Sequence, residues 1–317
     1  MGRTPALFDL HCDTLTRSLY CPATAGTGLL DDPAAQLSLS RMPAGTKWVQ
    51  CFAVFVPDDK RGAEGAAFFD RWAAAFAREM EREKDRVCWC RSAGDLAAAM
   101  DAGKFGALLT VEGGSALGGK LERMDTLWDA GVRMMTLTWN GHNELASGHD
   151  TGEGFSSFGR EAVAAMEERG ILVDVSHLND RGFEELLDIA QKPFVASHSN
   201  ARSVCAHRRN LPDAFIQEMV RRGGLIGLNY CQNFLSNDGR GDLEDLWRHV
   251  ERFLELGAEK CLALGSDYDG TDIHSDLDSV EKALGLYDFL IRRGLPEETA
   301  EDILFGNAWR FFQAALS

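Results

Sequence analysis

Basic charge, long apolar runs and an apolar leader segment are all scarce or absent in this 317-residue sequence. Its 33 lysines and arginines face 49 aspartates and glutamates, a formal net charge of −16, which argues against nucleic acids and anionic membranes as partners. No apolar stretch reaches the ~18 residues that a membrane span needs. Residues 1–13 lack the long apolar segment of a secretory signal. We therefore expect a cytoplasmic protein that binds neither nucleic acid nor membrane.

Closely spaced cysteine pairs are also missing. The eight cysteines are scattered, several of them inside apolar runs, and only Cys88 and Cys90 lie close together. No second pair accompanies them to form a zinc knuckle. In a chain of this size such spacing is typical of buried, reduced thiols and not of a disulfide framework.

The sequence does contain a regular alternation of strand-like and helix-like segments. The strand-like segments are short apolar runs at 6–13, 47–56, 106–114, 131–140, 171–178, 193–199, 223–230 and 261–270. Helical patterns occur at 64–84, 92–102, 120–129, 157–169, 180–190, 212–222, 242–256 and 278–293. Near-continuous apolar strands alternating with helices predict a parallel sheet covered on both faces. Eight such units predict an α/β fold, a single (β/α)8 TIM barrel over residues 1–317.

An open, doubly wound sheet is the alternative fold. It is disfavoured because no glycine-rich phosphate turn follows the first strand. Polar residues instead end early, middle and late strands alike, and the catalytic groups of a β/α barrel project from the C-terminal ends of its strands. Six acids and imidazoles stand at such ends: His11, Asp13, Glu112, His177, His198 and Asp267.

Five of these residues have the chemistry of a metal site. His11 and Asp13 are two apart on a strand, so both side chains leave one face and can share a divalent ion such as zinc. His177 and His198 end successive strands, whose ends are neighbours in a barrel, which suits a second metal position. Glu112 precedes two glycines that permit a sharp turn beside its carboxylate. Each residue alone is compatible with a structural role, but their gathering at one rim favours an active site.

Asp267 has two readings on sequence grounds. It closes the eighth strand in Leu-Gly-Ser-Asp-Tyr-Asp-Gly, where a carboxylate can ligate a metal or carry a proton. Asp269 competes for that role, although Gly270 beside it is more typical of a turn.

Several segments together resemble the membrane (renal-type) dipeptidase family, peptidase family M19 of the amidohydrolase superfamily. They are FDLHCDTL, TVEGG, DVSH, SHSNARSVCAHRRN and LGSDYDG between residues 8 and 270, with Phe305-Gly306-Asn307 near the C-terminus. The resemblance covers nearly the whole chain. It implies a (β/α)8 barrel that hydrolyses the peptide bond of small dipeptides, L-Xaa followed by an L- or D-residue.

The resemblance also implies a cofactor of two zinc ions (Zn2+) per chain. On the family pattern His11 and Asp13 bind one zinc, His177 and His198 bind the other, and Glu112 bridges both. Two divalent ions about 3.5–4 Å apart lower the pKa of a bridging water and provide a hydroxide nucleophile at neutral pH.

Two further residues match functional positions of the family. Asp267 matches the acid that handles the proton, taking it from the attacking water and returning it to the departing amine. Arg209 matches the arginine that receives the substrate's carboxylate, and its planar fork fits a carboxylate bidentately. Arg208 and Arg209 are adjacent, and only the match to the family segment singles out Arg209.

One departure from the family pattern concerns the carbonyl of the scissile bond. In vertebrate-type members the residue directly after Thr-Leu-Thr is a histidine that helps to polarise this carbonyl. In this sequence the residue at that position is Trp139. Three alternatives remain open: His142 reaches back from the loop, Asn140 donates the hydrogen bond, or a zinc ion acts alone. Tyr230 is a further candidate for substrate binding. Loops such as 139–156 and 231–242 are expected to build the side-chain pockets.

Two rival functions remain on sequence grounds. The first is another hydrolase of the superfamily, such as a lactonase or deaminase. Many of these use a carboxylated lysine as the bridging ligand, and the runs 106–114 and 131–140 contain no lysine. The second is a non-catalytic metal-binding protein, against which the presence of both Asp267 and Arg209 argues, since neither is needed merely to hold metal. The family resemblance further suggests a homodimer.

Overall fold

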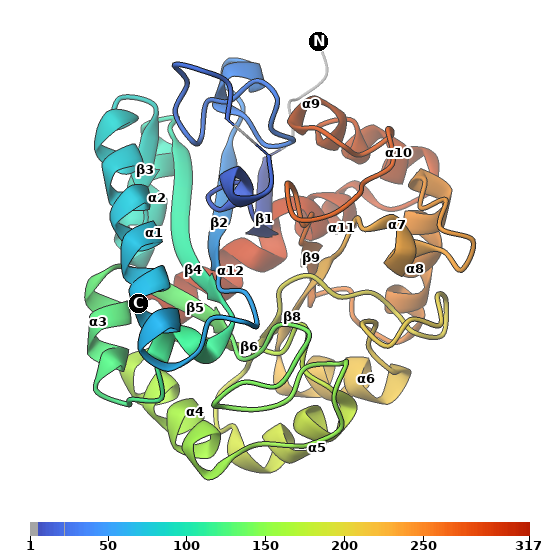
Figure 1. The fold of residues 1–317 in the computed structure, drawn as a ribbon. Coiled ribbons are helices and arrows are strands. Elements are labelled where there is room, and N and C mark those ends of the chain that lie inside the picture. Colours follow the sequence, from blue (N-terminus) through green and yellow to red (C-terminus); the bar gives the residue numbers. More distant parts are fainter. Residues whose placement is uncertain (1–5, 22) are drawn as a thin grey trace.

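Eight parallel strands close into a barrel in the computed structural model, which describes residues 6–21 and 23–317 (Figure 1). In spatial order they are β1 (Leu7–Cys12), β2 (Trp48–Phe55), β4 (Phe105–Glu112), β5 (Val132–Thr136), β6 (Leu172–Asp174), β7 (Val195–Ala196), β8 (Leu225–Leu228) and β9 (Leu262–Leu264). The sheet closes because β2 pairs with both β1 and β4, while β9 pairs with β1 and β8. The predicted (β/α)8 barrel is confirmed.

Each of the eight predicted apolar runs holds one barrel strand. A further short strand, β3 (Val87–Trp89), pairs in parallel with the first residues of β4, and the sequence does not predict it. Three residues are too few to display a strand period, and here they include Cys88 of the only close cysteine pair. All eight cysteines are unbridged, and six of them are buried.

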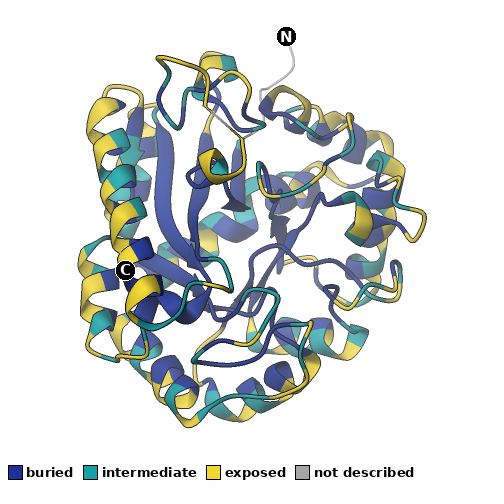
Figure 2. Ribbon diagram, in the orientation of Figure 1, coloured by how far each residue is buried: buried dark blue, intermediate teal, exposed yellow. Residues whose placement is uncertain are grey.

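Helices surround the strands, with their buried sides toward the barrel and their exposed sides outward (Figure 2). They are α1 (Gly62–Arg82), α2 (Ala93–Asp101), α3 (Arg123–Asp129), α4 (Ser157–Arg169), α5 (Asp180–Ile189), α6 (Asp213–Arg222), α7 (Gln232–Leu235), α8 (Leu243–Glu255), α9 (Val280–Ala283), α10 (Leu286–Arg292), α11 (Glu297–Glu301) and α12 (Asn307–Ala315). The predicted helix 278–293 is divided at Gly285 into α9 and α10. The helices α7, α11 and α12 are additional to the prediction.

The C-terminal helix α12 is fastened to the barrel by its first residue and by aromatic packing. Asn307 Nδ2 donates to the backbone oxygens of Glu259 and Leu262, each at 2.8 Å, which ties the helix to the start of β9. The ring of Phe312 lies 4.9 Å from that of Phe8 in β1. Among the described residues, none of the helices is both long enough and apolar enough to span a membrane.

Candidate metal centre

The six polar residues that the sequence places at strand ends meet at one rim of the barrel. His11 is the penultimate residue of β1 and Asp13 directly follows that strand, β4 ends on Glu112, and the turns after β6, β7 and β9 supply the rest. All six are buried, although an acid or imidazole is costly to bury without a partner. They form three overlapping groups in which the ligand atoms lie within 4.8 Å of one another: His11–Asp13–Glu112, Glu112–His177–His198 and His11–His198–Asp267.

Glu112 is shared between two of these groups, with one oxygen toward each. Its Oε1 lies 2.8 Å from His177 Nε2 and 3.5 Å from His198 Nε2. Its Oε2 lies 3.7 Å from His11 Nε2, which is itself 3.5 Å from Asp13 Oδ2. A carboxylate divided in this way has the geometry of a bridge between two neighbouring cation positions.

Hydrogen bonds behind the two later histidines fix which ring nitrogen faces the centre. His177 Nδ1 donates to Asn140 Oδ1 at 2.8 Å. His198 Nδ1 donates at 2.7 Å to Ser197 Oγ, whose own hydrogen goes to the Asp174 carboxylate. Both Nε2 atoms then carry lone pairs, and they face each other at 3.0 Å. Facing lone pairs repel, and a cation bound by both nitrogens removes that repulsion, so this donor set fits a metal ion.

The buried carboxylates of the cluster also favour a positive charge among them. Burial opposes a charge on His11, but the carboxylates of Glu112 and Asp13 outweigh it and raise the pKa of His11 to about 10. Burial, followed by the Asp13 carboxylate, raises the pKa of Glu112 well above its usual range. Burial lowers the pKa of His177 and of His198 well below the ordinary value. Neutral imidazoles beside buried carboxylates are suitable ligands for divalent ions such as zinc.

The backbone at the rim turns sharply in order to aim these side chains. His177 and Asp267 have φ values of 68° and 63°, the left-handed region that non-glycine residues seldom adopt. Gly270 allows the turn after β9 to approach the centre, because a Cβ on it would lie 2.0 Å from Asp13 Oδ2 and 2.8 Å from Asp267 Oδ1. The backbone at Gly270 therefore forms part of the wall of the site.

Substituting Gly270 with alanine is expected to weaken metal binding while the protein stays folded. The atoms that must move are the ends of two side chains and not backbone, but one of them is a predicted ligand oxygen. We expect zinc affinity, measured by competition with a chelator, to fall by about 10–100-fold, as for other displaced metal-site groups. Gly152→Ala is the matched control, because a Cβ there meets nothing within 4 Å. Unchanged affinity in Gly270→Ala would contradict the assignment of Asp13.

The Asp267 side chain faces the centre and accepts a hydrogen bond from Asn229. Its Oδ2 accepts a hydrogen bond from Asn229 Nδ2 at 3.0 Å, while Oδ1 lies 3.9 Å from His11 Nε2. Burial is the largest cause of a raised pKa for Asp267. A carboxyl group with one fixed oxygen and one oxygen toward the reacting position is suited to exchange a proton.

Asp269, the competing acid, is engaged elsewhere. Its Oδ2 accepts from Thr14 Oγ1 at 2.6 Å, and its Oδ1 accepts from the Gln36 backbone N–H at 2.7 Å. Arg17 Nε lies 3.4 Å from Oδ1. Asp269 thus fastens the segment that follows β1 to the turn after β9, although its side chain also borders the cavity.

Arg209 lies beside the centre, buried, and with one donor unused. Its Nη2 donates to the His198 backbone oxygen at 3.0 Å, and its Nη1 lies 3.3 Å from Ser199 Oγ. The guanidinium carbon lies 5.5 Å from the ring centre of Phe234. The Nε–H is buried without a partner, and Arg209 is not among the residues that line the cavity over the cluster.

A cavity of about 520 Å3 opens over the metal-ligand cluster. Both loops expected to shape the side-chain pockets contribute to it, 139–156 through Trp139, Asn140 and His149, and 231–242 through Phe234. The members of the cluster that line it are Asp13, Glu112, His177 and Asp267. The cavity therefore reaches four of the six acids and imidazoles at the barrel rim.

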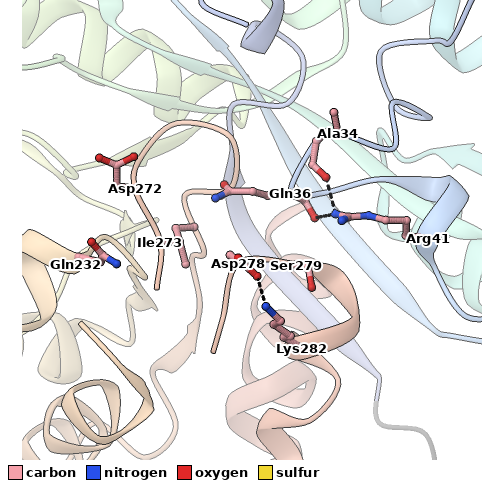
Figure 3. Close-up of a pocket in the computed structure, with 10 residues that line it drawn as sticks. Ala34, Gln36, Arg41, Gln232, Asp272, Ile273, Asp278, Ser279 and Lys282 are labelled. Atoms are coloured by element: carbon pink, nitrogen blue, oxygen red, sulfur yellow. Dashed lines mark hydrogen bonds and ion pairs between the residues drawn. The ribbon is translucent and has the colours of Figure 1, made fainter. Parts of the chain in front are cut away.

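A second cavity, of about 680 Å3, lies beside the turn after β9 and has a different character (Figure 3). Its cationic groups already have partners: Arg41 donates to the Gln36 backbone oxygen at 2.8 Å, and Lys282 donates to Asp278 at 2.6 Å. None of the ligand clusters found in the described part of the chain lines it. Of these two cavities, the smaller one is therefore the one that borders the candidate metal-binding residues.

The three remaining candidates from the sequence lie in different surroundings. His142 is exposed, does not border the smaller cavity, and has Nδ1 3.3 Å from Ser147 Oγ. Asn140 borders the cavity, but its oxygen holds His177. Tyr230 is fully buried against Tyr268 and is not part of the lining.

His149 is a cavity residue that the sequence does not single out. Its side chain is 8% exposed, its ring centre lies 5.7 Å from that of His177, and its Nδ1 is buried without a partner. A backbone hydrogen bond of 2.9 Å from His149 N to the His177 oxygen holds it there. In the sequence, His149 is distinguished by nothing more than its position in the loop 139–156. The composition of a loop does not show which of its side chains turns inward.

Comparison with known proteins gives a consistent result over the whole chain. The family model described as membrane dipeptidase (peptidase family M19) matches residues 2–316. A curated relative, an uncharacterised protein in the pqqA 5′ region of Klebsiella pneumoniae, is 30% identical over 234 residues, 70% of this chain and 86% of its own length.

Solved structures with the same fold include two metallopeptidases. One is the dipeptidase AC of family M19, with a TM-score of 0.91, 26% identity and 99% of each chain covered. The other is a metallopeptidase from Rhodobacter sphaeroides bound to a phosphinate mimic of the dipeptide L-Ala-D-Ala. Its TM-score is 0.91 at 25% identity, over 99% of this chain and 100% of that one. The probable dipeptidase PvdM from Pseudomonas aeruginosa, at 19% identity and a TM-score of 0.85 over 98% and 96%, shares the fold.

Proposed function

Because the chain belongs to the membrane dipeptidase family, peptidase family M19, and is a metal-dependent dipeptidase, we propose that it works with two zinc ions at this centre. His11 and Asp13 would hold one ion, His177 and His198 the other, with Glu112 between them. The observation that carries the proposal is the division of the two Glu112 oxygens between two ligand groups. When bound, the ions would supply an activated water and polarise the carbonyl of the substrate.

The chain's own residues then manage the proton and the substrate. Asp267 Oδ1 takes the proton of the attacking water and returns it to the departing amine, which otherwise leaves poorly. Asn229 fixes the other oxygen of Asp267, so the carboxyl group keeps one orientation throughout. Arg209 binds the free carboxylate of the dipeptide through its unpartnered Nε–H and an adjacent Nη amino group of the guanidinium.

Removing the Arg209 guanidinium is expected to weaken recognition of the chain end. Arg209→Ala should raise KM and lower kcat/KM by a factor that corresponds to about 2–4 kcal/mol of transition-state stabilisation. The reason is that a charged hydrogen-bond partner of the substrate is lost. Arg209→Lys should recover only part of this, since an ammonium cannot reproduce the fork. Tripeptides and C-terminal amides should be poor substrates of the wild type. An amide that is hydrolysed as fast as the free acid would rule out carboxylate recognition.

We assign to His149 the hydrogen bond to the scissile carbonyl oxygen, in place of the histidine that is absent at Trp139. Its unpartnered Nδ1 and its place beside His177 in the cavity support this role. His149→Asn should lower kcat/KM by about tenfold to a hundredfold with metal content unchanged. The matched control is His142→Asn, at the exposed histidine of the same loop, which should retain wild-type kcat/KM. The opposite pattern would give the role to His142.

The decisive experiment is a screen of a dipeptide library with L- and D-residues at the C-terminus, with zinc present. The phosphinate mimic bound by the Rhodobacter sphaeroides relative motivates the inclusion of L-Ala-D-Ala. Hydrolysis that requires metal and is confined to dipeptides supports the proposal. Turnover of lactones or amino-heterocycles without turnover of any dipeptide would overturn it.

The cellular location and the oligomeric state belong to the proposal as well. Eight unbridged cysteines, most of them buried, support a reducing compartment, and we propose the cytoplasm. A homodimer is the assembly that we expect in solution.

A further inference from the structure

Three aromatic side chains form one side of the substrate cavity, and we call them the aromatic wall: Tyr20, Phe55 and Trp139. The ring centre of Tyr20 lies 6.3 Å from that of Phe55, and Phe55 meets Trp139 edge-on at 4.9 Å. Tyr20 is 67% exposed, which is unusual for an aromatic side chain that borders a cavity. An exposed aromatic surface next to the reacting groups is suited to cover an apolar part of a substrate.

The topology places Phe55, the middle residue of the aromatic wall, across the barrel from the arginine that binds the carboxylate. Phe55 ends β2, and Arg209 belongs to the segment that follows β7. Around the closed barrel three strands separate β2 from β7 in either direction, so the two lie on opposite sides of the mouth. The metal-ligand cluster lies between them, with Glu112 at the end of β4 next to β2.

This arrangement decides which part of a dipeptide meets the wall. With the C-terminal carboxylate at Arg209 and the scissile carbonyl over the metal ligands, the N-terminal residue extends toward β2. We propose that the aromatic wall binds the side chain of the N-terminal residue and makes the enzyme prefer dipeptides whose first residue is large and apolar. This inference rests on the proposed function.

Charge on the same side of the cavity supports the preference. The cation that borders the cavity near the wall, Arg17, is already paired with Asp32 at 2.9 Å and with Asp269 at 3.4 Å. An acidic first residue would therefore lie against aromatic side chains without an uncommitted cation to pair with. It should be disfavoured relative to an apolar residue of similar size.

The test compares dipeptides that differ only in the first residue: L-Phe-D-Ala, L-Ala-D-Ala and L-Asp-D-Ala. The zinc-loaded wild type should show a kcat/KM at least about tenfold higher for the first than for the second, within the range that an apolar pocket can discriminate. L-Asp-D-Ala should be the poorest of the three. Among phosphinate mimics of the same peptides, the mimic of L-Phe-D-Ala should have the lowest inhibition constant and the mimic of L-Asp-D-Ala the highest, a readout independent of turnover.

Two variants connect the preference to the aromatic wall. Tyr20→Ala should reduce the Phe-to-Ala ratio of kcat/KM by about two- to tenfold, the worth of one aromatic contact. Leu19→Ala, at the neighbouring exposed residue outside the cavity lining, should keep the wild-type ratio. Dipeptide hydrolysis with no preference for phenylalanine, or a ratio unchanged in Tyr20→Ala, would overturn this inference and leave the proposed function standing. Failure to hydrolyse any dipeptide would overturn both.

Discussion

Glu112→Gln is expected to abolish activity and to release at least one of two zinc ions. The neutral amide removes the negative charge that both ligand groups share, and its NH2 replaces one of the two oxygens, of which Oε1 faces His177 and His198 while Oε2 faces His11. The loss should amount to several kcal/mol of transition-state stabilisation, on the order of a thousandfold or more in kcat/KM. Elemental analysis after zinc reconstitution, together with steady-state kinetics on a dipeptide, measures both effects.

The control for this prediction is Glu168→Gln on the exposed side of α4, which should keep two ions and full activity. A Glu112→Gln protein that still binds two ions would show that Glu112 is not the bridge. Wild-type protein without any bound divalent metal after reconstitution would overturn the proposed mechanism as a whole.

Asp267→Asn is expected to separate proton transfer from metal binding. Metal content should stay close to two per chain, while kcat falls by about 10²–10⁴, the typical contribution of a positioned general acid–base. The amide can still accept a hydrogen bond from Asn229, so the side chain should keep its place while losing the ability to carry the proton. If metal content collapses instead, Asp267 is chiefly a ligand.

Asp269→Asn provides the comparison two residues away. Asp269 accepts hydrogen bonds from Thr14 and Gln36, so its loss should lower stability by about 1–3 kcal/mol through the segment that follows β1. It should change kcat by less than tenfold. A kcat effect larger than that of Asp267→Asn would exchange the two roles.

The strands and their ends could be predicted because barrel strands are buried on both faces. Such strands read as short apolar runs, and a charged residue at the end of a run is conspicuous, as Glu112 is after Leu108–Val111. The barrel then requires that all these ends lie at one rim, so His11 and Asp267, far apart in the sequence, could be expected to meet. The family resemblance added the pairing of ligands, which strand periodicity alone does not supply.

The loops could not be predicted because their side chains follow no period. His142 and His149 lie in one loop, and only the folded path shows that His149 turns inward while His142 faces solvent. That path depends on specific hydrogen bonds, such as Asn143 Nδ2 to the Leu137 oxygen at 2.7 Å. Tyr20 follows β1 in a segment without regular strands, so its approach to Phe55 has no sequence signal.

The contact between the first and last barrel strands determines when the centre can form during synthesis. Ser266 Oγ donates to the His11 backbone oxygen across a sequence separation of 255 residues. At about 5–20 residues per second, a ribosome needs roughly 10–50 s to make the intervening chain. His11 and Asp13 therefore emerge long before Asp267 and the strand that closes the barrel, so the centre is complete, with its proton-carrying acid in place, only when nearly the whole chain has been made.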